Sequence, residues 1–321
     1  MMEIGAKSGR RDFPGGVWPV MLTPFTERNE VDYPALGRLT DWYLEGGCSG
    51  LFAVTQSSEM FFLTPGERIE IARYVIERVA GRVPVIAGGH VSDSLEDQIL
   101  EVNRMSGTGA DAVILTTNRL AAREEGDEVW IANMKRLLDN IPRETKLGLY
   151  ECPYPYKRVL SRRLTEWCAD CGRFYFLKDT SCDLENIRMK LSLCSGSNLR
   201  LYNANTATLL ASLREGAAGY SGVMANMQIR LYDLLTREFE REEMEELSDA
   251  LTMCALIEKQ WYPTNAKYYL QLEGVRMGLS CRVQDAGAMT GTQKDEVAML
   301  RRITGRLENR FLREVGHERN G

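Results

Sequence analysis

A lysine at the end of an apolar aromatic run is the residue of this chain best suited to covalent chemistry. Lys178 follows four large apolar or aromatic residues that are typical of a buried strand, Phe174-Tyr175-Phe176-Leu177. Burial at the strand end would favour the neutral amine and lower the pKa of the lysine, as a Schiff-base nucleophile requires. The alternative is a structural lysine whose ammonium group reaches solvent or pairs with Asp179.

The length and composition indicate one large globular fold. The chain has 321 residues, of which 44% are hydrophobic and 26% charged, so a sizeable core is available. The net charge is −5, and acids and bases are interspersed. We therefore expect neither nucleic acid nor a membrane surface as a partner. No apolar stretch approaches the roughly 20 residues of a membrane helix, and the basic, polar start of the chain lacks the apolar core of a secretory signal.

These features predict a cytoplasmic protein whose eight cysteines are reduced thiols. Cys168 and Cys171 have the spacing of a redox or zinc pair, but no second pair accompanies them. No other group of residues has metal-ligand spacing either, so we expect no metal.

Short apolar runs alternate with longer amphipathic segments along the first two thirds of the chain. We expect strands at residues 17–25, 50–54, 84–89, 112–117, 146–152, 174–179, 198–204 and 220–225. The expected helices lie at residues 32–46, 65–80, 92–106, 124–140, 161–170, 183–193 and 205–215, with start signals at Thr64 and Ser92. Eight strands that alternate with helices predict an α/β fold, a (β/α)8 TIM barrel. A doubly wound sheet is the competing fold, but no glycine-rich phosphate-binding loop follows an early strand.

After the eighth strand the pattern becomes helical. Amphipathic stretches at residues 231–259, 264–272 and 293–312 exceed the single helix that a barrel needs to close. We therefore divide the chain into an N-terminal tail (1–12), the barrel (13–227), a C-terminal helical region (228–314) and a C-terminal tail (315–321).

The carboxyl ends of the strands share one mouth of such a barrel, where catalytic groups lie. Tyr150 ends the fifth expected strand, and its phenol could move protons while the amine of Lys178 adds to a carbonyl. Candidate substrate-binding side chains at the other strand ends are Thr23, Gln56, Ser57, Ser58, Asn118, Arg119, Asn205 and Ser221. Simpler interpretations are a packing role for Tyr150 and turn capping by the serines. His90, Glu59 and Glu151 are further acid–base groups, although His90 also suits helix entry and loop acids are usually solvated.

Three segments carry recognisable motifs: Gly16-Val17-Trp18-Pro19-Val20-Met21-Leu22-Thr23-Pro24-Phe25, Leu149-Tyr150-Glu151-Cys152-Pro153 and Leu177-Lys178-Asp179-Thr180-Ser181. They resemble the first strand, the Tyr-Asn-x-Pro motif and the Lys-Asp/Glu-x-Ser/Thr motif of one family. This is the dihydrodipicolinate synthase / N-acetylneuraminate lyase family of class I, Schiff-base-forming aldolases. Most of the chain takes part in the resemblance.

The resemblance implies a lyase that forms a Schiff base with pyruvate or another 2-oxo acid and cleaves or forms a C–C bond. It implies Lys178 as the Schiff-base lysine and Tyr150 as the proton-shuttling phenol. Ser57 falls where the family binds the carboxylate of the 2-oxo acid. The resemblance implies no cofactor, and it implies a homo-oligomer, a tetramer or a dimer.

Three departures from the family pattern argue against dihydrodipicolinate synthesis itself. The family's Gly-Thr-Thr-Gly-Glu loop is Thr55-Gln56-Ser57-Ser58-Glu59 here, so Gln56 replaces the hydroxyl that relays protons to the tyrosine. Asn118-Arg119-Leu120 replaces a segment that holds a relay tyrosine, and Pro155 replaces an arginine that binds the second substrate. The alternatives are a Schiff-base dehydratase of a deoxy-keto sugar acid and a barrel that binds a ligand without catalysis.

Overall fold

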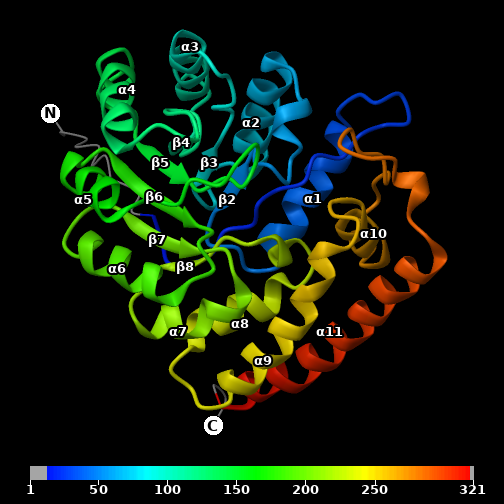
Figure 1. Cartoon of the computed structure of the whole chain (residues 1–321). Coiled ribbons are helices and arrows are strands. Elements are labelled where there is room, and N and C mark those ends of the chain that lie inside the picture. Colours follow the sequence, from blue (N-terminus) through cyan, green and yellow to red (C-terminus); the bar gives the residue numbers. More distant parts are fainter. Residues whose placement is uncertain (1–12, 319–321) are drawn as a thin grey trace, which may run out of the picture.

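Eight short parallel strands form the centre of the molecule (Figure 1). The computed structural model describes residues 13–318, with side chains to residue 312, so the predicted tail at 1–12 lies outside the described residues. The strands are β1 (Gly16–Val17), β2 (Leu51–Ala53), β3 (Val85–Ala87), β4 (Ala112–Thr116), β5 (Leu147–Tyr150), β6 (Phe174–Asp179), β7 (Arg200–Asn203) and β8 (Gly219–Tyr220). They pair in the order β1-β8-β7-β6-β5-β4-β3-β2, and a bridge between Val20 and Phe52 joins the two outer strands. The predicted (β/α)8 barrel is confirmed.

Eight helices surround the strands and further helices follow them in the chain (Figure 1). The surrounding helices are α1 (Tyr33–Glu45), α2 (Pro65–Val79), α3 (Leu95–Ser106), α4 (Asp127–Asp139), α5 (Arg162–Cys171), α6 (Leu184–Cys194), α7 (Leu209–Arg214) and α8 (Ile229–Glu238). The later helices are α9 (Met244–Cys254), α10 (Thr264–Leu272) and α11 (Gly291–Glu318). Short 3-10 turns are η1 (Met60–Phe62), η2 (Thr206–Thr208), η3 (Val223–Asn226), η4 (Ala255–Lys259) and η5 (Ala286–Ala288). The long helix α11 packs along α8, α9 and α10.

The first and last predicted strands are longer than the observed ones. Regular pairing ends after Val17 because Pro19 has no N–H to donate to a strand ladder, although its carbonyl still accepts from the Phe52 N–H at 3.0 Å. The eighth strand ends at Tyr220, and the chain then forms the 3-10 turn η3 instead of continuing to residue 225. By contrast, β6 covers residues 174–179 as predicted.

Two helix predictions also needed correction. The stretch 231–259 is not one helix but α8, α9 and η4, because α8 covers β1 and β8 whereas α9 packs on α7. Ser94, not Ser92, caps α3, since the Asp97 N–H donates to its hydroxyl at 3.1 Å and the Ser92 hydroxyl instead donates to Glu101. The predicted start of α2 is confirmed by a capping box between Thr64 and Glu67.

Aromatic side chains fill the barrel directly below the end of β6. Phe176 stacks on Tyr202 with ring centroids 4.1 Å apart, and it also contacts Trp18 at 5.2 Å and Phe52 at 6.1 Å. All four rings are buried. Because side chains two residues apart on a strand point the same way, Phe176 places Lys178 inside the barrel above this aromatic floor.

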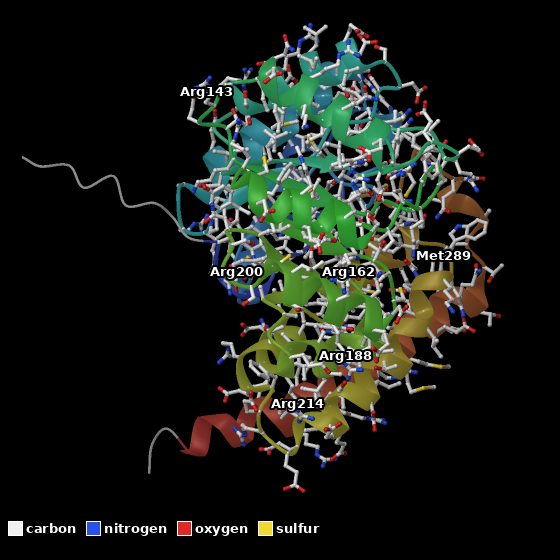
Figure 2. The ribbon with its side chains drawn as sticks, turned by 60° about the vertical axis from the view of Figure 1, so that its left-hand side comes forward. Arg143, Arg162, Arg188, Arg200, Arg214 and Met289 are labelled. Atoms are coloured by element: carbon white, nitrogen blue, oxygen red, sulfur yellow. The ribbon has the colours of Figure 1, made fainter. Side chains whose placement is uncertain are left out.

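The outer surface mixes charges of both signs. Arg162, Arg188 and Arg214 lie on α5, α6 and α7 (Figure 2), and each pairs with a nearby glutamate: Glu166, Glu215 and Glu245. Within residues 13–318, no helix has the length and apolar character needed to cross a membrane.

The contact that joins β1 to β8 gives a test of barrel closure. A Cβ at Gly219 would lie 1.9 Å from the carbonyl oxygen of Gly16, and the paired backbones of these two glycines cannot move apart without opening the barrel. We expect Gly219→Ala to lower the free energy of unfolding by about 3 kcal/mol, measured by urea denaturation. Gly66→Ala in α2 is the matched control because a Cβ there meets no atom within 4 Å. An equal loss in both variants would contradict this account of the closure.

Candidate active site

Lys178 and Tyr150 lie side by side at the mouth of the barrel. They end the neighbouring strands β6 and β5, and their Cα atoms are register partners. The Lys178 Nζ lies 4.5 Å from the centroid of the Tyr150 ring, and only 3% of the lysine surface is exposed. The structure therefore brings together the amine and the phenol that the sequence singled out.

Lys178 is the buried lysine without a carboxylate partner. Two other lysines are fully buried, and each forms ion pairs: Lys190 with Glu151 and Asp179, and Lys267 with Glu59. Among the described side chains, no acid lies within ion-pair distance of Lys178. Burial lowers the pKa of Lys178 to about 7, while Cys152 and Glu258 act in the opposite direction. The amine is thus available in its neutral, nucleophilic form near neutral pH.

Gln56, which stands where the family pattern has the relay hydroxyl, holds the Tyr150 phenol. Its OH donates to the Gln56 Oε1 at 3.2 Å, and the Cys152 thiol approaches the same oxygen at 3.6 Å. Burial raises the pKa of Tyr150 well above its usual value, so the phenol keeps its proton and can donate it. Gln56 orients this phenol, but an amide oxygen cannot itself pass a proton on.

Hydrogen bonds within the loop after β2 turn Gln56 and Ser57 toward the barrel axis. The Ser58 hydroxyl accepts from the Thr55 N–H at 2.9 Å and donates to the Met21 carbonyl at 2.6 Å. The Thr23 hydroxyl donates to the Ser58 carbonyl at 2.9 Å. Thr23 and Ser58 therefore hold the loop, and their hydroxyls are already engaged.

A cavity of about 450 Å³ opens above the lysine and the phenol. Five of the predicted site residues line it: Lys178, Tyr150, Gln56, Ser57 and Asn205. Its mouth also carries Lys157 and Lys259. A space of this size accommodates a small organic acid together with a polar extension.

The remaining predicted substrate-binding residues lie outside this cavity. The Asn118 side-chain amide donates to three carbonyls of the loop after β5, those of Cys152, Tyr154 and Tyr156, at 2.6 to 2.9 Å. Arg119 pairs with Asp93 and covers the Phe61 ring, and the Ser221 hydroxyl donates to the Trp18 carbonyl at 3.1 Å. Together with Thr23 and Ser58, these side chains support the mouth from behind.

The C-terminal region supplies further cavity residues that the sequence analysis missed, among them Tyr262 and Glu258. The Tyr262 OH accepts from the Asn226 Nδ2 at 2.9 Å, and burial raises the pKa of this phenol although Ser57 and Asn226 oppose that shift. Glu258 is partly buried, and burial raises the pKa of its carboxyl although Lys178 opposes that shift. The only sequence feature near them is the Tyr262-Pro263 pair between two helical stretches. Such a pair predicts a turn of the chain, but it does not predict that the turn lies beside the cavity.

The acid–base candidates outside the lysine–tyrosine pair have structural partners. Glu59 and Glu151 are buried and ion-paired rather than solvated, contrary to the expectation for loop acids. His90 receives the Thr116 N–H at 3.2 Å and contacts Gln98 at 3.0 Å, and burial lowers its pKa to about 4. In the described part of the chain, no three histidine, cysteine or acidic side chains cluster as metal ligands would.

Comparison with known proteins agrees with this geometry. A sequence profile of the dihydrodipicolinate synthetase family matches residues 13–301. The chain belongs to this family. It is accordingly a lyase of the Schiff-base aldolase class, as predicted from its motifs.

Relatives and solved structures of the family align with most of the chain. The 4-hydroxy-tetrahydrodipicolinate synthase of Porphyromonas gingivalis is 25% identical over 302 residues, which are 92% of this chain and 98% of that protein. The Bacillus subtilis enzyme of the same name is 30% identical over 217 residues, 66% of this chain and 72% of its own. The dihydrodipicolinate synthase of Cyanidioschyzon merolae, solved with lysine bound, has a TM-score of 0.82 at 21% identity and covers 92% of this chain and 99% of its own. From the three departures in the motifs, we expected that the chain would not be a dihydrodipicolinate synthase. These similarities do not support that expectation.

The unpaired buried amine predicts a specific pH dependence of stability. The folded state lowers the pKa of Lys178 from 10.5 to about 7, so the unfolded chain binds the proton more tightly. Burial of this amine therefore lowers stability, fully below pH 7 and progressively less as the pH rises toward 10.5. Lys178→Met should therefore be more stable than the wild type at pH 6, by up to roughly 4 kcal/mol, and this gain should shrink between pH 7 and 10. Urea denaturation at several pH values measures it.

Gln56→Met is the control because it changes the same cavity without removing a titrating group. Its effect on stability should stay constant with pH. A Lys178→Met effect that is likewise constant would show that the amine is not desolvated as described.

Proposed function

We propose that Lys178 forms a Schiff base with pyruvate or another 2-oxo acid and that the enzyme then cleaves or forms the neighbouring C–C bond. The observation that carries this proposal is the buried amine without a carboxylate partner, 4.5 Å from the Tyr150 ring at the base of a cavity. The pKa of about 7 supports attack by the neutral amine on a carbonyl carbon.

Tyr150 supplies the proton that imine formation needs. Attack of the Lys178 amine on the carbonyl carbon gives a carbinolamine, whose hydroxyl must leave as water. The Tyr150 phenol, neutral because its pKa is raised, donates the proton to that hydroxyl. The resulting iminium accepts the electron pair of the C3–C4 bond and becomes an enamine, while the Tyr150 phenolate takes the proton of the C4 hydroxyl, which becomes a carbonyl. The reverse steps form the bond.

Ser57 and Tyr262 bind the carboxylate of the 2-oxo acid in this proposal. The Asn226 amide is oriented by its neighbours, since its Nδ2 donates to the Val20 carbonyl at 3.0 Å and its Oδ1 accepts from Tyr43. The same Nδ2 donates to the Tyr262 oxygen, which leaves the phenol proton free for an acceptor in the cavity. Two hydroxyl donors on one wall suit a carboxylate.

Gln56 and Asn205 are proposed as further substrate contacts because both line the cavity. For Thr23, Ser58, Asn118, Arg119 and Ser221 we instead propose a supporting role, since the hydrogen bonds and ion pair described above engage them outside the cavity. The tail of the substrate meets Lys157, Lys259 and Glu258 at the mouth, so a polar tail fits best.

A second candidate activity is the dehydration of a deoxy-keto sugar acid through the same imine. Glu258 favours it, because a carboxyl with a raised pKa on the cavity wall can protonate a departing hydroxyl. A purely ligand-binding barrel has no comparable support, since the family is one of lyases.

We further propose a homo-oligomer, a tetramer or a dimer, in the cytoplasm. The family resemblance supports the assembly. All eight cysteines are free thiols, which suits a reducing compartment.

Reductive trapping tests the imine directly. Incubation with pyruvate and borohydride should add the mass of the reduced adduct to Lys178, as seen by intact mass and peptide mapping. Lys178→Met should gain no such mass.

A panel of other 2-oxo acids and deoxy-keto sugar acids identifies the substrate class, and NMR of the products separates C–C cleavage, dihydrodipicolinate synthesis and dehydration. A wild-type enzyme that forms no adduct at Lys178 with any member of the panel would overturn the proposal.

Loss of the hydroxyl group should affect the kinetic constants differently at Tyr150 and at Tyr262. We expect Tyr150→Phe to lower kcat about a hundredfold because it removes the proton donor. Tyr262→Phe should mainly raise KM for the 2-oxo acid, about tenfold, because it removes one hydrogen bond to the carboxylate. Steady-state kinetics on the best substrate of the trapping panel measure both.

Tyr269→Phe is the matched control, since Tyr269 is a buried phenol of α10 that does not line the cavity. It should leave both constants unchanged. If Tyr262→Phe behaved like this control, Tyr262 would not bind the carboxylate.

A further inference from the structure

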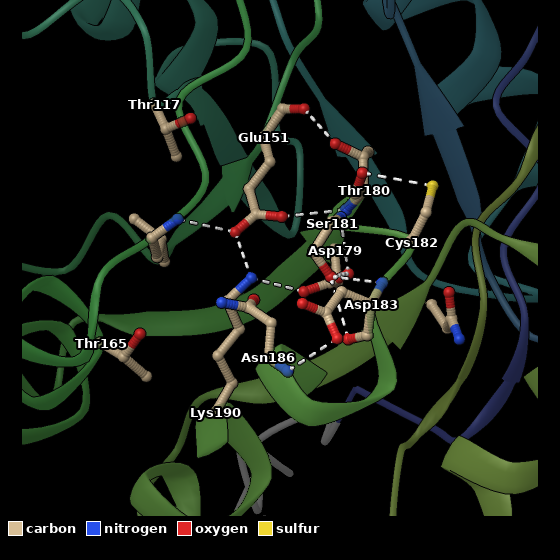
Figure 3. Close-up of polar contacts among 12 residues, drawn as sticks. Thr117, Glu151, Thr165, Asp179, Thr180, Ser181, Cys182, Asp183, Asn186 and Lys190 are labelled. Carbon is tan, nitrogen blue, oxygen red and sulfur yellow. Dashed lines mark hydrogen bonds and ion pairs between the residues drawn. The ribbon is translucent and has the colours of Figure 1, made fainter. Parts of the chain in front are cut away.

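A second buried lysine joins the two strands that carry the amine and the phenol. Lys190 of α6 donates to Glu151 and, at 2.5 Å, to the Oδ2 of Asp179 (Figure 3). The side chains of all three residues have no exposed surface. Glu151 directly follows Tyr150 at the end of β5, and Asp179 directly follows Lys178 on β6.

The alternation of side chains along a strand couples this cluster to the site. Successive side chains point to opposite faces, so Tyr150 and Lys178 face the cavity while Glu151 and Asp179 face the surrounding helices. The ammonium group of Lys190 therefore links the two strand ends from the outer side. A shift of one strand end relative to the other would separate Lys178 from Tyr150 and stretch both ion pairs at once.

Further hydrogen bonds make the cluster part of the cavity wall. The Glu151 carboxylate also accepts from the N–H groups of Leu160 and Thr180, at 2.8 and 2.9 Å. The Thr180 hydroxyl donates to the Glu151 carbonyl at 2.6 Å, and Thr180 lines the cavity. Glu151 thus ties the loops after β5 and β6 to each other and to α6.

We propose that Lys190 is a positioning residue for the imine chemistry: its ion pairs with Glu151 and Asp179 hold the Lys178 amine and the Tyr150 phenol at their reactive separation. This inference rests on the proposed function. It assigns a role to a lysine that touches neither the cavity nor a substrate. A displacement of reacting groups by about 1 Å can cost a hundredfold in rate, so loss of the link should affect catalysis more than binding.

The test compares Lys190→Met with a double variant that restores the link without an ammonium group. Lys190→Met leaves two carboxylates facing each other, and we expect the rate constant of imine formation with pyruvate to fall about a hundredfold, with KM changed less than threefold. In Asp179→Asn/Lys190→Met, the new amide can donate to Glu151 while its oxygen still accepts from Ser181, and the formal charge of the cluster equals that of the wild type. We expect this variant to recover at least tenfold of the loss. Rates are measured by single-turnover cyanoborohydride trapping, well below each Tm.

Leu137→Ala in α4 is the control for lost stability alone. Leu137 is fully buried near the C-terminal end of its helix, at the opposite end of the barrel from the mouth. It should lower Tm and leave the trapping rate unchanged. If Lys190→Met does not fold, Glu151→Gln replaces it, because that change weakens only the β5 side of the link and should also slow trapping.

The outcomes separate this inference from the proposed function. A wild-type enzyme that is not trapped at Lys178 fails the proposed function. A trapped wild type whose Lys190→Met variant folds and reacts within threefold of the wild-type rate overturns the positioning role. A double variant that recovers nothing over Lys190→Met also overturns it, since the cross-strand link would then not be what matters.

Discussion

Removal of one lysine amine from water is the constraint on which the rest of this structure depends. Lys178 stands above Phe176, Tyr202, Trp18 and Phe52, whose buried rings are in contact with one another. Such an arrangement needs a closed barrel, because only there do side chains of several strands converge on one axis. The cost of desolvating the ammonium form is what makes the amine nucleophilic, so the barrel core acts directly on the chemistry.

The buried lysines Lys178, Lys190 and Lys267 have two different kinds of surroundings. Lys190 and Lys267 meet carboxylates and serve as charged links between segments distant in sequence. Lys178 meets an aromatic ring instead, and no carboxylate among the described side chains pairs with it. A buried ion pair is a poor source of net stability, but breaking one by removal of a single partner is costly, which makes such pairs suitable for holding a geometry. Ion pairs thus lie on the outer side of the strand ends at the mouth, whereas the aromatic core lies beneath Lys178.

Much of the framework could be predicted because its signals are local. The aromatic run before Lys178 predicted β6 residue by residue, and Thr64 with Glu67 predicted the start of α2. The missed parts depend on distant segments. Tyr262 and Glu258 reach the cavity only because the C-terminal helices fold back over the mouth, and nothing in their neighbourhood along the chain specifies that. Arg119 and Asn118 follow a strand end as substrate-binding residues would, but their side chains turn outward to Asp93 and to the loop after β5.

By itself, the sequence determined the eightfold alternation of strands and helices, the family, and the lysine–tyrosine pair that we propose as the chemical centre. Hydrophobic period and motif spacing are properties of short stretches, which is why they can be recognised without a structure. Tertiary structure decided which residues surround Lys178 and Tyr150. These are the aromatic rings whose packing buries Lys178 and lowers its pKa, and the phenol of Tyr262 near Ser57. On the outer side of both strands they are the ion pairs of Lys190 with Glu151 and Asp179. Burial and ion pairing depend on what packs against a side chain from other segments, and only the folded chain brings those segments together.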